Sequence, residues 1–114
     1  FSYLWELSKP PESSLAQAAV WLHAMACRFL PRVREARYVE FWAHCRRPAA
    51  GHSLHYDSDD EGCGGIRNPL CSTVLFLTGG VGGPTLVTNQ RLGGSLATKG
   101  WLVAPRANRV AVFD

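Results

Sequence analysis

From residue 37 onward, the sequence consists of short runs of strand-forming residues separated by turns that contain glycine or proline. The strongest run covers residues 71–78 and is apolar at nearly every position after Thr73, which is typical of a strand buried on both faces. The glycine-rich residues 79–84 form a tight connection after it. Further strands are predicted at residues 85–88, within residues 96–104 with 101–103 as the firmest part, and from residue 109 to residue 113. Several short strands with turn signals between them favour a sandwich, a barrel or a jelly roll.

Residues 37–46 begin this β region with a clear alternation of side chains. One face of the predicted strand carries every second residue from Tyr38 to His44, and the intervening residues are mainly apolar. After a turn that contains proline and glycine, a shorter strand is predicted at residues 54–57. The polar, glycine-bearing residues 58–69 are expected to form a loop.

The N-terminal part differs, because its periodicity is helical. Residues 1–12 end near a double proline, which stops regular structure, so a loop is expected there. Ser14 and Gln17 fit a capping box at the start of a helix over residues 14–29. The apolar residues of that helix recur at steps of three and four and predict one apolar stripe: Leu15, Ala18, Leu22, Met25 and Phe29.

These elements predict a mostly β fold with an N-terminal helix, in which residues 1–36 form a helical support region and residues 37–114 form the β core. The 114 residues, 46% of them hydrophobic and 18% charged, suffice for one domain with a modest core. The net charge of +3 is mild, and the six basic residues from Arg28 to Arg47 follow no single helical face, so no nucleic-acid partner is expected. No apolar run approaches the roughly 20 residues that span a bilayer, so no membrane segment is expected either. The pattern predicts no particular oligomeric state.

The four cysteines, Cys27, Cys45, Cys63 and Cys71, have spacings that match no CxxC zinc or redox pattern. Cys27 and Cys45 fall in apolar elements, where a free thiol is an ordinary small core residue. We therefore favour reduced thiols and an intracellular location. The sequence begins without methionine and ends within the last predicted strand, so we expect it to be a piece of a longer protein.

The tripeptide His55-Tyr56-Asp57 carries the candidate chemistry. In a strand, residues two apart lie on the same side, so an imidazole and a carboxylate would stand next to each other. These are two of the three ligands of the two-histidine, one-carboxylate site that holds non-haem Fe(II). A His-x-Asp tripeptide is common by chance, however, and the alternative is an exposed histidine beside an acidic loop.

Two other metal sites compete for the same residues. Asp57, Asp59, Glu61 and Gly62 match positions 1, 3, 5 and 6 of a Ca²⁺ loop, but Asn68 stands where a bidentate glutamate is required. A zinc site is the second alternative, although its spacings fit no common zinc module; it would use His52, His55, Cys63 and Cys71. Both fit the sequence less well than the iron half-site.

Four segments occur in an order that resembles a known family. They are residues 38–44 with the turn into 55–57, residues 68–78, residues 82–87 with their Gly-Gly-Pro-Thr sequence, and residues 103–114. Together they resemble the Fe(II)- and 2-oxoglutarate-dependent dioxygenases of the prolyl-4-hydroxylase-like superfamily. Relatives commonly show Gly-Gly-x-Thr in the third segment, and the fourth is similar to the turn and strand before their distal histidine.

The resemblance covers residues 37–114 and implies a double-stranded β-helix, a jelly roll of cupin-like type, that is incomplete at its C-terminus. It implies hydroxylation of a peptidyl or small-molecule substrate coupled to decarboxylation of 2-oxoglutarate, with ascorbate as an accessory reductant. Fe(II) would be held by His55, Asp57 and a second histidine. That histidine, and an Arg or Lys for 2-oxoglutarate, are expected after Asp114, and Arg109 precedes them and receives no role. The 114-residue stretch by itself is therefore expected to be inactive.

A second hypothesis comes from another functional class. In it the β region is a non-catalytic binding module, either a cupin-like barrel or a degenerate oxygenase domain. The two hypotheses differ in the distal histidine and the cationic residue beyond it, which only the enzyme requires.

Overall fold

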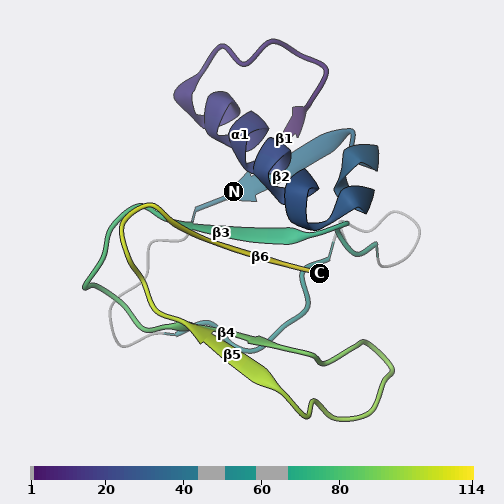
Figure 1. Ribbon diagram of the computed structural model, residues 1–114, viewed down its shortest axis with the longest axis vertical. Coiled ribbons are helices and arrows are strands. Elements are labelled where there is room, and N and C mark those ends of the chain that lie inside the picture. The colour runs from purple at the N-terminus through teal and green to yellow at the C-terminus, as the bar shows by residue number, and fades with distance from the viewer. Residues whose placement is uncertain (1, 44–50, 59–66) are drawn as a thin grey trace. The chain divides into compact units, whose positions relative to one another are not determined.

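The computed structural model describes residues 2–43, 51–58 and 67–114 of the chain. Two compact units cover residues 1–46 and 47–114, and each is described by itself (Figure 1). The elements of the described residues are β1 (Ser2–Glu6), α1 (Ser14–Phe29), the 3₁₀ helix η1 (Pro31–Glu35), β2 (Tyr38–Trp42), β3 (Ser72–Phe76), β4 (Thr85–Thr88), β5 (Gly100–Val103) and β6 (Arg109–Phe113). The prediction of a mostly β chain with an N-terminal helix is confirmed.

The first unit contains a strand that the sequence did not predict. β1 pairs with β2 in antiparallel register, from Ser2 opposite Trp42 to Glu6 opposite Tyr38. The expected loop over residues 1–12 is therefore wrong in its first half, because five of its residues find a partner strand. β2, which the sequence placed at the start of the β core, lies in this unit with α1.

Opposed residues of an antiparallel pair share one face of the sheet, and here that face carries the aromatic contacts. The rings of Tyr3 and Phe41 stack with centroids 5.6 Å apart and planes 18° apart. Trp5 and Val39 are the next opposed pair, and both are half-buried. Exposed and half-buried residues alternate along β2, as the sequence pattern of this strand predicted.

Helix α1 has the predicted bounds, but its N-cap is Ser13 instead of Ser14. The Ser13 side chain accepts a hydrogen bond from the backbone N–H of Ala16 at 3.1 Å, and its carbonyl accepts from Gln17 at 2.9 Å. The predicted capping box of Ser14 with Gln17 is therefore wrong. Only Ser14 has a glutamine three residues on, but Ser13 has the extended backbone of an N-cap residue, with φ of −114° and ψ of 157°, so Ser13 caps the helix.

The buried face of α1 consists of alanines. Ala16, Ala19 and Ala26 are at most 4% exposed, whereas Leu15 is 51% and Phe29 is 69% exposed. The predicted apolar stripe through Leu15 and Phe29 is thus not the packed face. Alanine adds little to a hydrophobic pattern, yet its small side chain lets neighbouring backbone approach the helix closely.

A histidine ties α1 to η1. The His23 Nε2 atom lies 3.1 Å from the carbonyl oxygen of Val33, which is 3% exposed. Because a carbonyl can only accept, Nε2 carries the hydrogen and donates it. The Cys27 sulfur, one turn along the helix, lies 3.6 Å from the same nitrogen. His23 therefore serves a structural role in the first unit.

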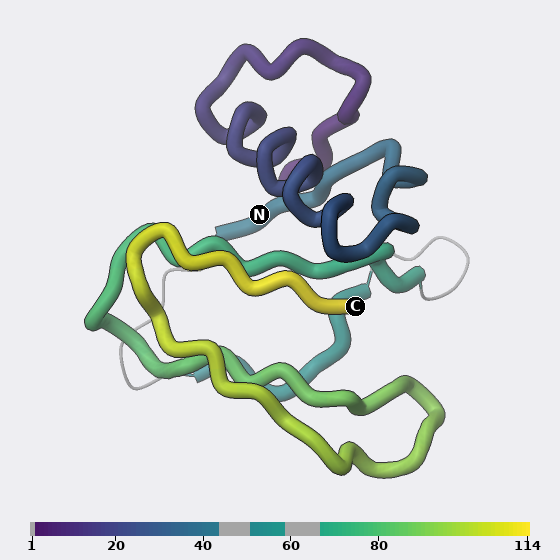
Figure 2. The backbone as a smooth tube through the Cα atoms, viewed as in Figure 1, coloured from purple at the N-terminus to yellow at the C-terminus, as the bar shows by residue number. Residues whose placement is uncertain are grey.

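In the second unit, two antiparallel pairs are nested one inside the other. β3 pairs with β6, and β4 pairs with β5, so the chain folds back along itself as one two-stranded ribbon (Figure 2). The ribbon is interrupted between the pairs, at residues 77–84 on one side and 104–108 on the other. The predicted strands at residues 85–88 and 109–113 are confirmed with their bounds.

Two positions in the ribbon's interruptions require special backbone angles. Gly82, in the glycine-rich connection, has φ of 82°, a backbone conformation that is strained for a residue with a side chain. Asn108 has φ of 59°, a left-handed conformation that asparagine adopts more readily than other residues. Its N–H donates to the carbonyl of Phe76, at the end of β3, at 2.8 Å, and the Arg109 N–H donates to the Arg106 carbonyl at 3.0 Å and closes the turn before β6.

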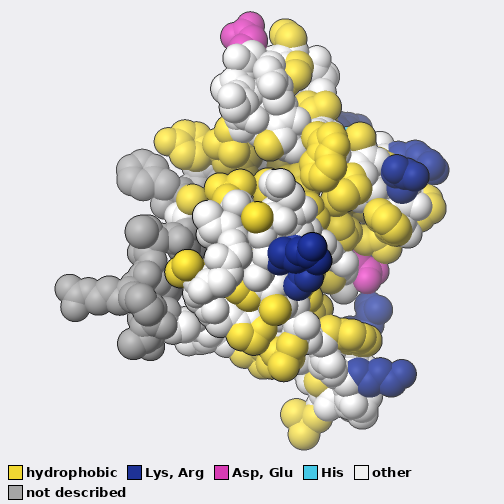
Figure 3. Space-filling view, turned by 60° about the vertical axis from the view of Figure 1, so that its left-hand side comes forward, with side chains coloured by type: hydrophobic (Ala, Val, Ile, Leu, Met, Phe, Trp, Pro, Cys, Tyr) yellow, Lys and Arg dark blue, Asp and Glu magenta, His cyan; other side chains and the backbone are white. Residues whose placement is uncertain are grey.

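Burial in the described residues is shallow. The fully buried apolar residues are Ala16, Ala19, Ala26 and Val33. Apolar side chains cover much of the surface seen in Figure 3, and Leu77 is 76% exposed. β3 is half-buried at every position, so the prediction that residues 71–78 are buried on both faces is wrong in degree.

The described strands form three sheets of two strands each. These sheets do not close into a barrel within the described ranges, so the jelly roll stays a prediction. Neither helix in this part of the chain has the length and apolar character that crossing a membrane requires.

We expect Ser13→Ala to lower the free energy of unfolding by about 1 kcal/mol, because it leaves a helix N–H without its acceptor. Ser14→Ala is the matched control and should change stability by less than about 0.5 kcal/mol. Urea unfolding followed by circular dichroism at the helical band measures both. Equal losses in the two variants would contradict the assignment of the cap.

We expect Ala26→Leu to lower the free energy of unfolding by about 1–3 kcal/mol, because the larger side chain overfills a closely packed position. Ala24→Leu introduces the same side chain at an exposed position of α1 and serves as the control. The same unfolding measurement separates them. A stable Ala26→Leu variant would show that α1 is not packed through its alanines.

Candidate metal centre

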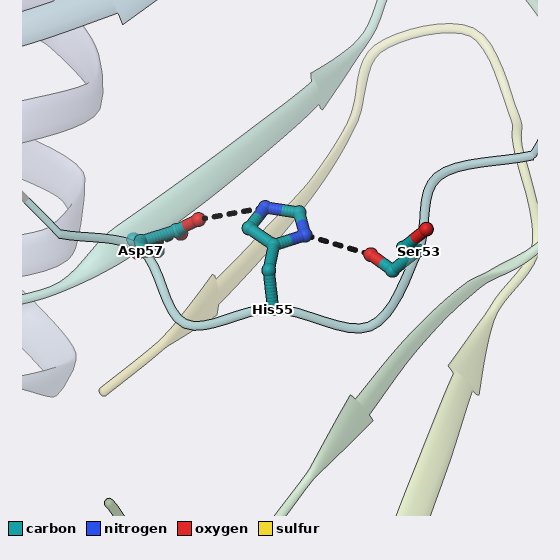
Figure 4. A network of polar contacts seen from close by, with 4 residues as sticks. Ser53, His55 and Asp57 are labelled. Carbon is teal, nitrogen blue, oxygen red and sulfur yellow. Dashed lines mark hydrogen bonds and ion pairs between the residues drawn. The ribbon is translucent and has the colours of Figure 1, made fainter.

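His55 and Asp57 are brought together although they do not lie on a strand. Residues 51–58 contain no regular strand, so the predicted strand at residues 54–57 is wrong. A strand depends on hydrogen bonds to a neighbour, and this segment is paired with none of the described strands. Nevertheless His55 Nε2 lies 3.4 Å from Asp57 Oδ1, as expected for residues two apart on one side (Figure 4).

The other nitrogen of the His55 ring is held by the backbone. Nδ1 lies 2.8 Å from the carbonyl oxygen of Ser53, as Figure 4 shows. Because the carbonyl only accepts, Nδ1 carries a hydrogen, and Nε2 is the nitrogen directed at Asp57. Metal-binding histidines commonly donate their second ring N–H to a carbonyl in this way, which fixes both the tautomer and the ring orientation.

The carboxylate of Asp57 is held from the other side by the β ribbon. The hydroxyl of Ser72, the first residue of β3, donates to Asp57 Oδ2 at 2.5 Å. This leaves Oδ1 directed at His55. The side chain of Asp57 is 22% exposed, compared with 56% for His55, so the carboxylate lies on the more protected side of the pair.

The contact between Nε2 and Oδ1 has a chemical consequence. With a hydrogen on Nδ1, a neutral His55 ring presents a lone pair to Asp57, and two lone pairs at 3.4 Å repel each other. The contact is favourable only when a proton or a metal ion is shared between the two atoms. Two ligands about 2.1 Å from one cation and at a right angle lie about 3 Å apart. The pair therefore fits two neighbouring positions around one transition-metal ion.

Ser72 is the site residue that sequence reasoning missed. It lies fifteen positions after Asp57, within the segment of residues 68–78, and its sequence context indicated no role in metal binding. Its only signal is a hydroxyl at the start of an otherwise apolar run, and many strands begin that way. Only the fold shows that its hydroxyl reaches the carboxylate.

Residues 2–43, 51–58 and 67–114 contain no group of three or more histidine, cysteine or acidic side chains arranged to hold a metal ion. The His52 ring lies 6.0 Å from the His55 ring between centroids and is tilted by 39°. Of the residues in the Ca²⁺ and zinc alternatives, Asp59, Glu61, Gly62 and Cys63 lie outside the described residues. The same holds for Cys45.

Comparison of the chain with protein-family models, with curated proteins and with solved structures finds no match. The interpretation of this site therefore rests on the contacts of His55 and Asp57 and on the order of the sequence motifs.

Proposed function

We propose that the chain belongs to the core of an Fe(II)- and 2-oxoglutarate-dependent dioxygenase, in which His55 and Asp57 are two of the three iron ligands. One observation carries the proposal: Nε2 and Oδ1 face each other at 3.4 Å while the outer atoms of both side chains are held by hydrogen bonds. That arrangement supplies one nitrogen and one oxygen ligand, as a facial iron site requires.

The topology of the second unit supports the proposed jelly roll. A jelly roll contains two facing sheets joined by strands that cross from one to the other. The nested pairs β3–β6 and β4–β5 make a two-stranded ribbon that bends between its two halves, which is the winding such a fold needs. The ribbon also presents Ser72 to the carboxylate of Asp57.

The residues of the chain would hold and orient the metal. Fe(II) together with 2-oxoglutarate and dioxygen would supply the hydroxylating chemistry when bound. His55 contributes a nitrogen whose direction is set by the Ser53 carbonyl, and Asp57 contributes one oxygen. A metal held by ligands on one face would keep its remaining positions for the co-substrate and for dioxygen, next to a peptidyl or small-molecule substrate. The resemblance places the third ligand and the cation that binds 2-oxoglutarate after Asp114.

We expect the full-length protein to consume 2-oxoglutarate in the presence of Fe(II), dioxygen and ascorbate. His55→Ala and Asp57→Ala should each lower that turnover by more than about 100-fold. Losing a residue that only hydrogen-bonds to a metal ligand already lowers metal affinity or activity by up to about 100-fold, and losing the ligand itself should cost more. Succinate formation measures the turnover. His52→Ala removes a neighbouring imidazole, whose ring lies 6.0 Å from that of His55, and it should keep wild-type turnover.

Two results would contradict the proposal. Unchanged turnover in both the His55 and the Asp57 variants would remove these residues as ligands. A full-length protein without iron-dependent turnover would instead support the non-catalytic cupin-like or degenerate binding module.

A further inference from the structure

We propose that Ser72 determines the metal selectivity of this site, by restricting Asp57 to a single ligating oxygen and so favouring a transition-metal ion over Ca²⁺. The inference rests on the proposed half-site of His55 and Asp57 and adds a specificity-determining residue to it.

The hydrogen bond from Ser72 is well suited to hold one carboxylate oxygen. It runs from a hydroxyl to a carboxylate, and hydrogen bonds to an ionised acceptor are about twice as strong as neutral ones. The backbone of Ser72 is fixed by β3, where it lies opposite Phe113 of β6. A residue of the ribbon thus orients a side chain from a segment that has no regular structure of its own.

The restriction affects metal ions differently. Ca²⁺ takes six to eight oxygen ligands and commonly uses both oxygens of a carboxylate. Iron, zinc, copper and nickel accept imidazole nitrogen readily, which Ca²⁺ does not. With Oδ2 engaged by Ser72 and Oδ1 beside His55 Nε2, the pair offers one oxygen and one nitrogen. Such a pair suits a transition-metal ion and disfavours Ca²⁺ binding at Asp57.

A purely structural role for Ser72 makes a different prediction. If its hydroxyl only tied residues 51–58 to β3, its loss would weaken binding of all metal ions alike or lower stability. Selectivity between two metal ions would then stay the same. The ratio of two affinities therefore distinguishes the roles.

The test uses the full-length protein with Co²⁺, which replaces Fe(II) without air oxidation, and with Ca²⁺ as the second probe. Isothermal titration measures both dissociation constants. Ser72→Ala should raise the Kd for Co²⁺ about 10–100-fold, which is the usual effect of losing a residue that hydrogen-bonds to a metal ligand. The Kd for Ca²⁺ divided by the Kd for Co²⁺ should therefore fall. Ser72→Thr keeps the hydroxyl and should restore the wild-type ratio.

Ser53→Ala is the matched control. Ser53 contacts His55 through its carbonyl, so removing its hydroxyl leaves that contact in place and should not change the ratio. The role of Ser72 would be overturned if Ser72→Ala kept the wild-type ratio of the two dissociation constants, or if Ser72→Thr lowered that ratio as much as Ser72→Ala. The proposed half-site of His55 and Asp57 would still stand. Co²⁺ affinity that is unaffected by both His55→Ala and Asp57→Ala would instead overturn the half-site and the proposed function, and the role of Ser72 with it.

Discussion

Main-chain hydrogen bonding between antiparallel strands is the constraint on which the rest of this structure depends. Fully buried apolar side chains among the described residues are few and small, namely three alanines and Val33. Two-stranded sheets are marginally stable by themselves and need packing on one face. In the first unit α1 contacts both β2 and η1, and the buried residues of α1 are alanines. In the second unit, the nested ladders fix the register that brings Ser72 to its place.

The candidate site uses this rigidity indirectly. Neither His55 nor Asp57 lies on a strand, and each is oriented by one hydrogen bond. His55 donates to the backbone carbonyl of Ser53, and Asp57 accepts from the hydroxyl of Ser72 in the ribbon. The two anchored side chains place His55 Nε2 and Asp57 Oδ1 3.4 Å apart. Such a contact is favourable when a proton or a metal ion is shared between the two atoms, and the second case connects the fold to the proposed metal chemistry.

Sequence patterns predicted much of the local structure for identifiable reasons. The strands at residues 85–88 and 109–113 lie between clear turn residues, so their bounds are confirmed. β1 was missed because a double proline follows it, and because its pairing with β2 spans a sequence distance that no local pattern reveals. The cap of α1 was misassigned because Gln17 stands three residues after Ser14 and completes a capping-box pattern there. The packed face was misassigned because alanines give a weak hydrophobic signal.

For the candidate site, the sequence by itself determined the types of the two proposed ligands and their mutual spacing. His55 and Asp57 are two apart, so a locally alternating backbone places them on one side whether or not a strand forms. The local Ser53 carbonyl orients the His55 ring, and the tertiary structure decided which oxygen of Asp57 faces it, because Ser72 engages Oδ2. Ser72 comes from a strand far along the chain, and its position depends on the register of β3 with β6. Register is set by cooperative pairing of whole strands, and no single residue encodes it.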